Sequence, residues 1–200
     1  MSTYPKTVKL SGGGEITVRP AVKEDEQALH EFFCRVPQED RLFLKHDVTD
    51  RATIRGFMSE LSYDRIYPLT ARHGDEIVGH ATLHRDRHGW SRHVAEVRIV
   101  VTRGWQRKGV GTVLMHELIE HASQSGVDLV EALVLEGDRR AQRALEQMGF
   151  RIETTLRERA TDRTGRRCNI LVMVNETQEL WRRMDDLLQC DAEGASRRGE

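Results

Sequence analysis

The residues best suited to chemistry lie between Val97 and Thr112, where an apolar run gives way to a basic, glycine-containing turn. Gly109 and Gly111 would let a ligand approach the backbone where longer side chains would collide. The turn opens an amphipathic stretch, and the first amides of a helix have no partner within it and lie at the positive end of its dipole. Together with the adjacent basic side chains, these features predict a diphosphate site.

Two common phosphate-binding patterns fit this turn poorly. The P-loop pattern G-x-x-x-x-G-K-[ST] would start at Gly104, but Val110 and Gly111 stand where the lysine and the hydroxyl residue are needed. The dinucleotide pattern G-x-G-x-x-G would start at Gly109, but Leu114 takes the place of the third glycine. A third pattern, [RQ]-x-x-G-x-[GA] after a central strand, fits residues 106–111 at every fixed position.

Residues 106–111 thereby resemble the pyrophosphate loop of the GNAT superfamily of N-acetyltransferases. A second motif of that family, N-x-x-A-x-x-x-Y-x-x-x-G-F, is similar to residues 138–150. The resemblance implies acetyl-CoA or coenzyme A as cosubstrate and no metal. The cofactor-binding residues that it implies are Ile99, Val100, Val101, Gln106, Arg107, Lys108, Gly109, Val110, Gly111, Thr112 and Asp138.

Two positions depart from the second motif of the family. Asp138 replaces an asparagine that commonly hydrogen-bonds the cofactor. Leu145 replaces the tyrosine that many family members use as a general acid toward the departing thiolate. The resemblance therefore supplies no general acid at its usual place.

The resemblance also implies direct attack of a substrate amine on the thioester. An amine like that of lysine, with a pKa of ~10.4, is almost wholly protonated near neutral pH, and freeing it costs ~4–5 kcal/mol. A base is therefore useful, and Glu96 stands where many family members carry one. Its alternative is a surface ion pair with Arg98. The backbone of residues 99–101 is expected to pair with the pantetheine arm, and the Val101 amide to polarise the thioester carbonyl, an effect of ~3 kcal/mol.

The histidines raise the question of a metal site. His80 and His84 share a strand face, and His88 and His93 follow in the next loop, but no carboxylate or cysteine completes a recognisable ligand spacing. A place for His84 or His93 in the lining of the acceptor pocket is favoured over a metal site. The loop with Trp90 at its tip is either a solvated hairpin tip or a contact for a polar acceptor.

The elements that must position these residues follow from apolar periodicity and from Gly and Pro punctuation. A helix over 50–61 is predicted to be capped by Thr49, and the apolar run 128–136 to be a strand covered on both faces. Strand, helix and strand over 94–135 predict a parallel crossover. The remaining predictions are a hairpin over 7–19, helices over 24–36, 109–124 and 138–148, and strands over 67–72, 77–84, 93–102, 150–156 and 169–174.

Two hundred residues suit one domain. We expect an α/β (α+β) fold with the three layers of the GNAT superfamily: a mixed, mostly antiparallel central sheet flanked by helices, with one parallel β-α-β crossover. Residues 1–176 would form the acetyltransferase domain, and residues 177–200 a C-terminal helix and a disordered tail. The apolar stripe of that helix (Leu180, Trp181, Met184, Leu187 and Leu188) is interpreted as core or dimer contact, in a monomer or homodimer, rather than as a membrane surface.

Bulk properties argue against nucleic acid and membrane as partners. The 31 basic and 32 acidic residues nearly cancel, and no apolar run approaches the roughly 20 residues of a membrane span. Three scattered cysteines and an N-terminus without a signal-peptide core predict a cytoplasmic protein with reduced thiols.

The resulting hypothesis is an enzyme that moves an acetyl group from acetyl-CoA to a primary amine of a small molecule, a protein lysine or a protein N-terminus. The alternative is an acyl-CoA-binding sensor or regulatory module without turnover. The unusual residues Asp138 and Leu145 give that alternative its weight.

Overall fold

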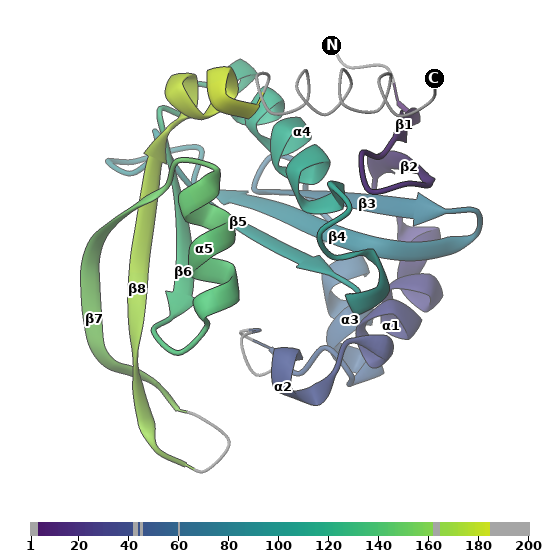
Figure 1. Cartoon of the computed structure of the whole chain (residues 1–200), viewed down its shortest axis with the longest axis horizontal. Coiled ribbons are helices and arrows are strands. Elements are labelled where there is room, and N and C mark those ends of the chain that lie inside the picture. Colours follow the sequence, from purple (N-terminus) through teal and green to yellow (C-terminus); the bar gives the residue numbers. More distant parts are fainter. Residues whose placement is uncertain (1–3, 42–43, 45, 60, 162–164, 185–200) are drawn as a thin grey trace.

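The computed structural model describes residues 4–41, 44, 46–59, 61–161 and 165–184. Eight strands form one sheet in the order β1-β2-β3-β4-β5-β6-β8-β7 (Figure 1). All neighbouring pairs are antiparallel except β5 and β6, which are parallel. The strands are β1 Lys6–Lys9, β2 Glu15–Pro20, β3 Ile66–His73, β4 Glu76–Arg85, β5 Val94–Val101, β6 Leu129–Leu135, β7 Arg151–Thr161 and β8 Arg167–Glu176.

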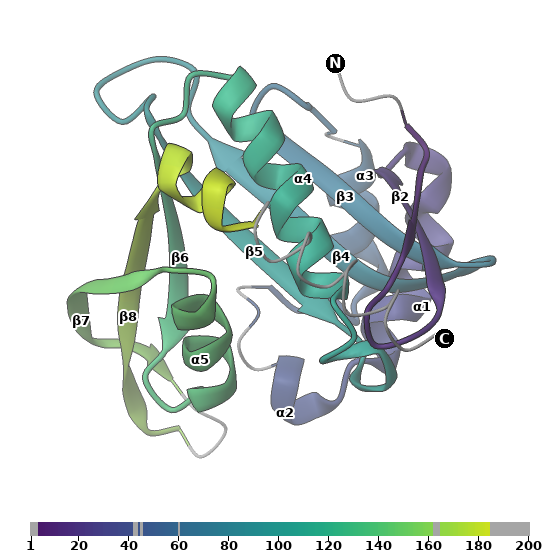
Figure 2. The same ribbon diagram turned by 45° about the horizontal axis from the view of Figure 1, so that its top comes forward.

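Helices cover both faces of this sheet, as Figure 2 shows. On one face α1 (Glu26–Arg35) and α3 (Arg51–Ser59) pack in one apolar cluster, and α2 (Gln38–Arg41) lies in the same layer. The other face carries α4 (Val110–Gln124) and α5 (Arg139–Gln147). The predicted three-layer fold, the hairpin over 7–19 and the parallel crossover are confirmed.

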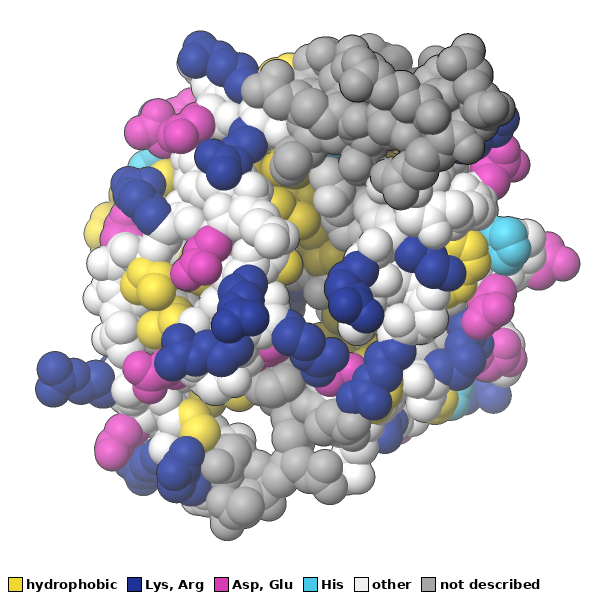
Figure 3. Space-filling view, viewed as in Figure 1, with side chains coloured by type: hydrophobic (Ala, Val, Ile, Leu, Met, Phe, Trp, Pro, Cys, Tyr) yellow, Lys and Arg dark blue, Asp and Glu magenta, His cyan; other side chains and the backbone are white. Residues whose placement is uncertain are grey.

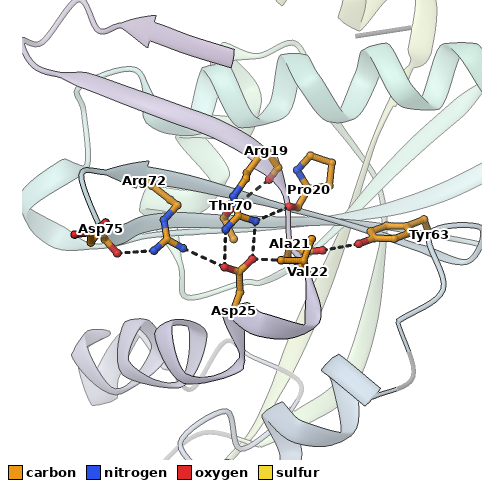
Figure 4. Close-up of polar contacts among 9 residues, drawn as sticks. All are labelled: Arg19, Pro20, Ala21, Val22, Asp25, Tyr63, Thr70, Arg72 and Asp75. Atoms are coloured by element: carbon orange, nitrogen blue, oxygen red, sulfur yellow. Dashed lines mark hydrogen bonds and ion pairs between the residues drawn. The ribbon is translucent and has the colours of Figure 1, made fainter. Parts of the chain in front are cut away.

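A buried carboxylate fixes the junction between β2 and α1. Asp25 accepts hydrogen bonds from both terminal nitrogens of Arg19 (2.7 and 2.6 Å), from the Val22 amide (2.9 Å) and from Arg72 of β3 (3.2 Å), as Figure 4 shows. Burial alone would raise the pKa of Asp25, but these donors outweigh it and hold the pKa below its ordinary value. The network ties the start of α1 to β2 and β3.

Two predictions about local structure are wrong. Asp50, rather than Thr49, caps α3, because its carboxylate accepts from the amides of Ala52 and Thr53 at 3.1 Å, whereas the Thr49 hydroxyl donates to Asp47. The strand β6 is not covered on both faces. Its residues alternate between half-buried and buried, and only Val130, Ala132 and Val134 are fully enclosed.

The chain beyond β8 continues as a helix over residues 177–184. Leu180 and Met184 are completely buried in the same cluster as α4, so this part of the predicted stripe belongs to the core. The predicted tail, with Leu187 and Leu188, lies outside the described residues. No helix of the described chain is long and apolar enough to span a membrane.

Candidate active site

The start of α4 is open to an anion. Gly109 is the N-cap and has φ +94°, a left-handed conformation that glycine adopts without strain. The first helical bond runs from the Val113 amide to the Gly109 carbonyl (3.0 Å). No side chain in the described part of the chain caps the helix, so the amides of residues 110–112 point outward at the positive end of the dipole.

The protein leaves room for a ligand at Gly111. A Cβ added there would meet only a methyl group of Val101, at 4.0 Å, so the fold itself does not require glycine at this position. The basic side chains of the loop lie close by. Arg107 is exposed, with φ +59°, and the Lys108 ammonium lies 4.8 Å from the centre of the Trp105 ring. The residues present therefore fit the diphosphate that the sequence predicts.

The β1–β2 turn supports this loop from behind, which the sequence did not reveal. A Cβ on Gly12 would lie 2.6 Å from the Lys108 Cα, so only glycine fits. Gly14 has φ +95° and its Cβ position is 3.2 Å from the Trp105 ring. The only signal in the sequence was the run of three glycines, which we interpreted as a turn and no more.

The parallel strands β5 and β6 separate beside the loop. Their pairing covers Val94–Leu129, Ala95–Val130 and Glu96–Glu131 and then ends, although β5 continues to Val101 and β6 to Leu135. Figure 1 shows the two strands diverging. All three of the predicted pantetheine contacts at the end of β5 are partly exposed: Ile99, Val100 and Val101.

The backbone of Val101 faces this opening. The Thr102 amide donates to the Val78 carbonyl of β4 (3.0 Å), and since successive amides of a strand point to opposite sides, the Val101 amide points away from β4. Its carbonyl accepts a hydrogen bond from the Gln106 side chain at 3.1 Å. The structure thus brings residues 99–101 and the loop 106–112 together as one surface.

Glu96 lies on the opposite face of the sheet from α4. It is in register with His84 of β4 on one side and with Glu131 of β6 on the other. Arg98 donates to both of its carboxylate oxygens, at 2.8 and 3.2 Å. The ion pair of the alternative interpretation is therefore present, and it leaves the Glu96 side chain 15% exposed.

Glu131 is the residue of this site that the sequence reasoning missed. It is the one charged residue in the strand Leu-Val-Glu-Ala-Leu-Val-Leu, which we described as a nearly continuous apolar run without giving this residue a role. An acidic residue within such a run was the available signal, because a charge on a central strand is costly unless it has a partner or a function.

The histidines have separate environments. His84 lies 2.8 Å from the Thr82 hydroxyl and beside Glu96, on the predicted acceptor side. Burial lowers the pKa of His80 to about 4, and its ring packs 5.5 Å from that of Phe33. His93 lies at the other end of β5, in a hollow of about 650 Å³. The described residues contain no group of three or more His, Cys, Asp or Glu side chains that could hold a metal ion.

The second motif forms the start of α5, across the opening from the loop. Asp138 caps this helix, with its carboxylate accepting from the Ala141 amide at 3.0 Å. Leu145 is half-buried and packs against the core cluster together with Ala141 and Met148. Ala144, in the same helix, is exposed.

A mixed sheet with one separating parallel pair, followed by an open helix start, defines an acetyltransferase fold of the GNAT type. Residues 26–150 match the model of the Acetyltransferase (GNAT) family. Since this match spans more than half of the chain, the protein belongs to that family.

Individual relatives agree with this assignment. The L-amino acid N-acetyltransferase AaaT of Escherichia coli is 27% identical over 151 residues, which are 70% of this chain and 86% of the relative. RimJ of Mycobacterium smegmatis, solved with CoA-disulfide, has a TM-score of 0.73 at 19% identity and covers 92% of this chain and 95% of its own. Salmonella typhimurium yncA, solved with its cofactor acetyl-CoA, has a TM-score of 0.65 at 19% identity and covers 81% and 94%.

Proposed function

We propose that this GNAT-family acetyltransferase transfers the acetyl group of acetyl-CoA to a primary amine by direct attack. The observation that carries the proposal is the continuous surface formed by the open start of α4 and the end of β5 beyond its pairing with β6. The solved complexes of yncA with acetyl-CoA and of RimJ with CoA-disulfide support a coenzyme A ligand for this fold.

In this proposal residues 106–112 bind the diphosphate, and the backbone of residues 99–101 binds the pantetheine arm. The Val101 amide, which points into the opening, donates to the thioester oxygen and stabilises the charge that develops there. Asp138 contributes from the other side of the opening, where its role as helix cap leaves its second oxygen for a further contact.

Glu96 is proposed as the base that takes the proton of the incoming ammonium, directly or through water. The amine nitrogen then forms a bond to the carbonyl carbon, and the bond between carbon and sulfur breaks. The nitrogen gives up a second proton, which ends on the sulfur, so that the products are an amide and a free thiol. Glu131 beside it adds a second carboxylate in register. Together the two acidic groups favour a cationic acceptor. Arg98 pairs with Glu96 and neutralises part of this negative charge, which weakens the preference.

The sensor without turnover is the weaker proposal, because membership of the family and the activity named for AaaT favour an enzyme. A thiol-release assay with amino acids, polyamines and peptides distinguishes the two. Release of CoA with any acceptor supports the enzyme, while tight binding of acetyl-CoA without release with any acceptor would replace it by the sensor. We place the reaction in the cytoplasm, in a monomer or homodimer, on the sequence argument given above.

A further inference from the structure

One carboxylate joins the elements that follow the two separating strands. Asp40 of α2 accepts from Arg103 Nε at 3.3 Å with one oxygen and from Arg140 Nη2 at 2.9 Å with the other. Arg103 lies in the short turn directly after β5, and Arg140 lies in α5 directly after β6. The Asp40 side chain is only 17% exposed, whereas the two arginines are 50% and 67% exposed.

The position of this three-residue bridge follows from the break in strand pairing. Pairing of β5 and β6 ends at Glu96 and Glu131, so no ladder holds their carboxyl ends at a fixed separation. Figures 1 and 2 show α2 next to the ends of these strands, between α5 and the other helices of its own layer. Figure 3 shows Lys and Arg side chains gathered around the hollow on this face. Asp40 thus links the two sides of the opening.

The bridge also connects the two helix layers. Asp40 belongs to the layer of α1 and α3, and Arg140 belongs to α5 on the opposite face of the sheet. A single exposed ion pair is worth little. A carboxylate that is only 17% exposed and is shared by two guanidinium groups has both of its oxygens engaged, so its loss removes a contact common to three elements.

We propose that Asp40 is a positioning residue that sets the width of the cofactor cleft by holding Arg103 and Arg140 together. The inference rests on the proposed function, since it assumes that coenzyme A binds between the ends of β5 and β6. It goes beyond that function because Asp40 contacts neither the phosphate loop nor the proposed base.

The sign of two substitutions tests this proposal against simple charge attraction. Coenzyme A is a polyanion, so attraction alone predicts that Asp40→Asn strengthens its binding and that Arg140→Gln weakens it. If Asp40 sets the cleft width, both variants bind acetyl-CoA more weakly, by roughly three- to tenfold. The double variant should then lose no more affinity for acetyl-CoA than the single variant that binds it less tightly, because either substitution alone already breaks the bridge. Calorimetry at physiological salt measures all four proteins.

Matched controls separate this effect from a general loss of stability. Asp64→Asn removes the same charge and a single exposed ion pair with Arg87 (2.9 Å) outside the cleft, and it should bind acetyl-CoA as the wild type does. Asp40→Glu keeps the charge and should restore part of the affinity. Asp40 contacts no reacting group, so its loss should raise KM for acetyl-CoA while kcat at saturation stays within about twofold.

A measurement without ligand separates the structural role of the Asp40 bridge from the proposed binding of coenzyme A. Hydrogen exchange of the amides in residues 38–41 and 139–142 should be faster in Asp40→Asn than in wild type, and unchanged in Asp64→Asn. If wild type binds no coenzyme A but exchange changes as expected, the proposed function fails and the bridge stands. If wild type binds and Asp40→Asn binds as tightly or more tightly, the positioning role is overturned.

Discussion

Glu96 and Glu131 are the last residues that β5 and β6 pair before the two strands separate. Two carboxylates therefore lie side by side on one face of the sheet, at the inner end of the opening. The proposed proton acceptor, Glu96, therefore lies where the pairing of β5 with β6 ends. In the proposed reaction, the thioester would reach this point along the end of β5, and the amine would come from the face of α1 and α3.

Gly111→Glu should abolish binding of CoA and acetyl-CoA without unfolding the protein. The added side chain meets open space in the protein, with the nearest atom 4.0 Å from its Cβ, but its carboxylate would repel the diphosphate. Calorimetry and thermal unfolding measure both effects. Gly56→Glu, on α3 and also in open space, is the matched control and should bind normally. Tight binding by the Gly111 variant would show that the site lies elsewhere.

Glu96→Gln should lower turnover mainly near neutral pH, with the rate recovering in alkaline solution. The amide cannot take a proton, and a primary amine loses its own proton only as the pH approaches ~10. Thiol release measured from about pH 6 to 10 on wild type and variant gives the comparison. A pH–rate profile of unchanged shape would exclude Glu96 from proton transfer.

Glu131→Gln should raise KM for a cationic acceptor more than it lowers kcat. The residue supplies a second negative charge beside Glu96 without being the proposed base. Steady-state kinetics with one charged amine, under conditions that saturate acetyl-CoA, separate the two constants. A fall in kcat as large as that of Glu96→Gln, with KM unchanged, would contradict this division of roles.

Leu145→Ala should cost about 1–2 kcal/mol, less than the 2–5 kcal/mol of a fully buried leucine, because the side chain is only half-buried. Turnover per folded molecule should stay the same if Leu145 only packs. Leu145→Tyr should keep or raise the rate, since a positioned acid is worth at most ~10²–10⁴-fold and a thiol with pKa ~8.5 already leaves tolerably. Denaturant unfolding and initial rates provide the measurements, and a lower rate in the tyrosine variant would count against an acid role at this position.

Asp25→Asn should destabilise the protein by about 3–5 kcal/mol, since it leaves Arg19 and Arg72 without their shared carboxylate. The pKa of Asp25 is lower in the folded state than in the unfolded state. Its stabilising contribution is therefore complete above the unfolded pKa of ~3.9 and is lost as the pH falls through the folded value. Unfolding free energies of wild type should decline in acid more steeply than those of Asp25→Asn, and parallel curves would refute the assignment.

The local parts of the site could be predicted from the sequence because neighbouring residues determine them. The loop at Gly109 and the start of the helix near residue 138 each depend on a few consecutive residues and on the helix that follows. The positions of Glu131 and Asp40 depend on strand pairing and on contacts between residues far apart in the chain, which periodicity does not encode. The cap of α3 was misjudged by one residue because Thr49 and Asp50 are both good caps, and only the path of the chain decides between them.

The packing of Gly12 against Lys108 has a consequence for how variation in this protein should be interpreted. The β1–β2 hairpin lies at the edge of the sheet. It nevertheless fixes the position of the phosphate-binding loop after β5, which lies nearly a hundred residues later in the chain. A change at Gly12 or Gly14 would displace the loop and weaken cofactor binding, although every residue of the phosphate motif remained intact. Conservation of the motif alone is thus an incomplete measure of whether such a chain retains its cofactor.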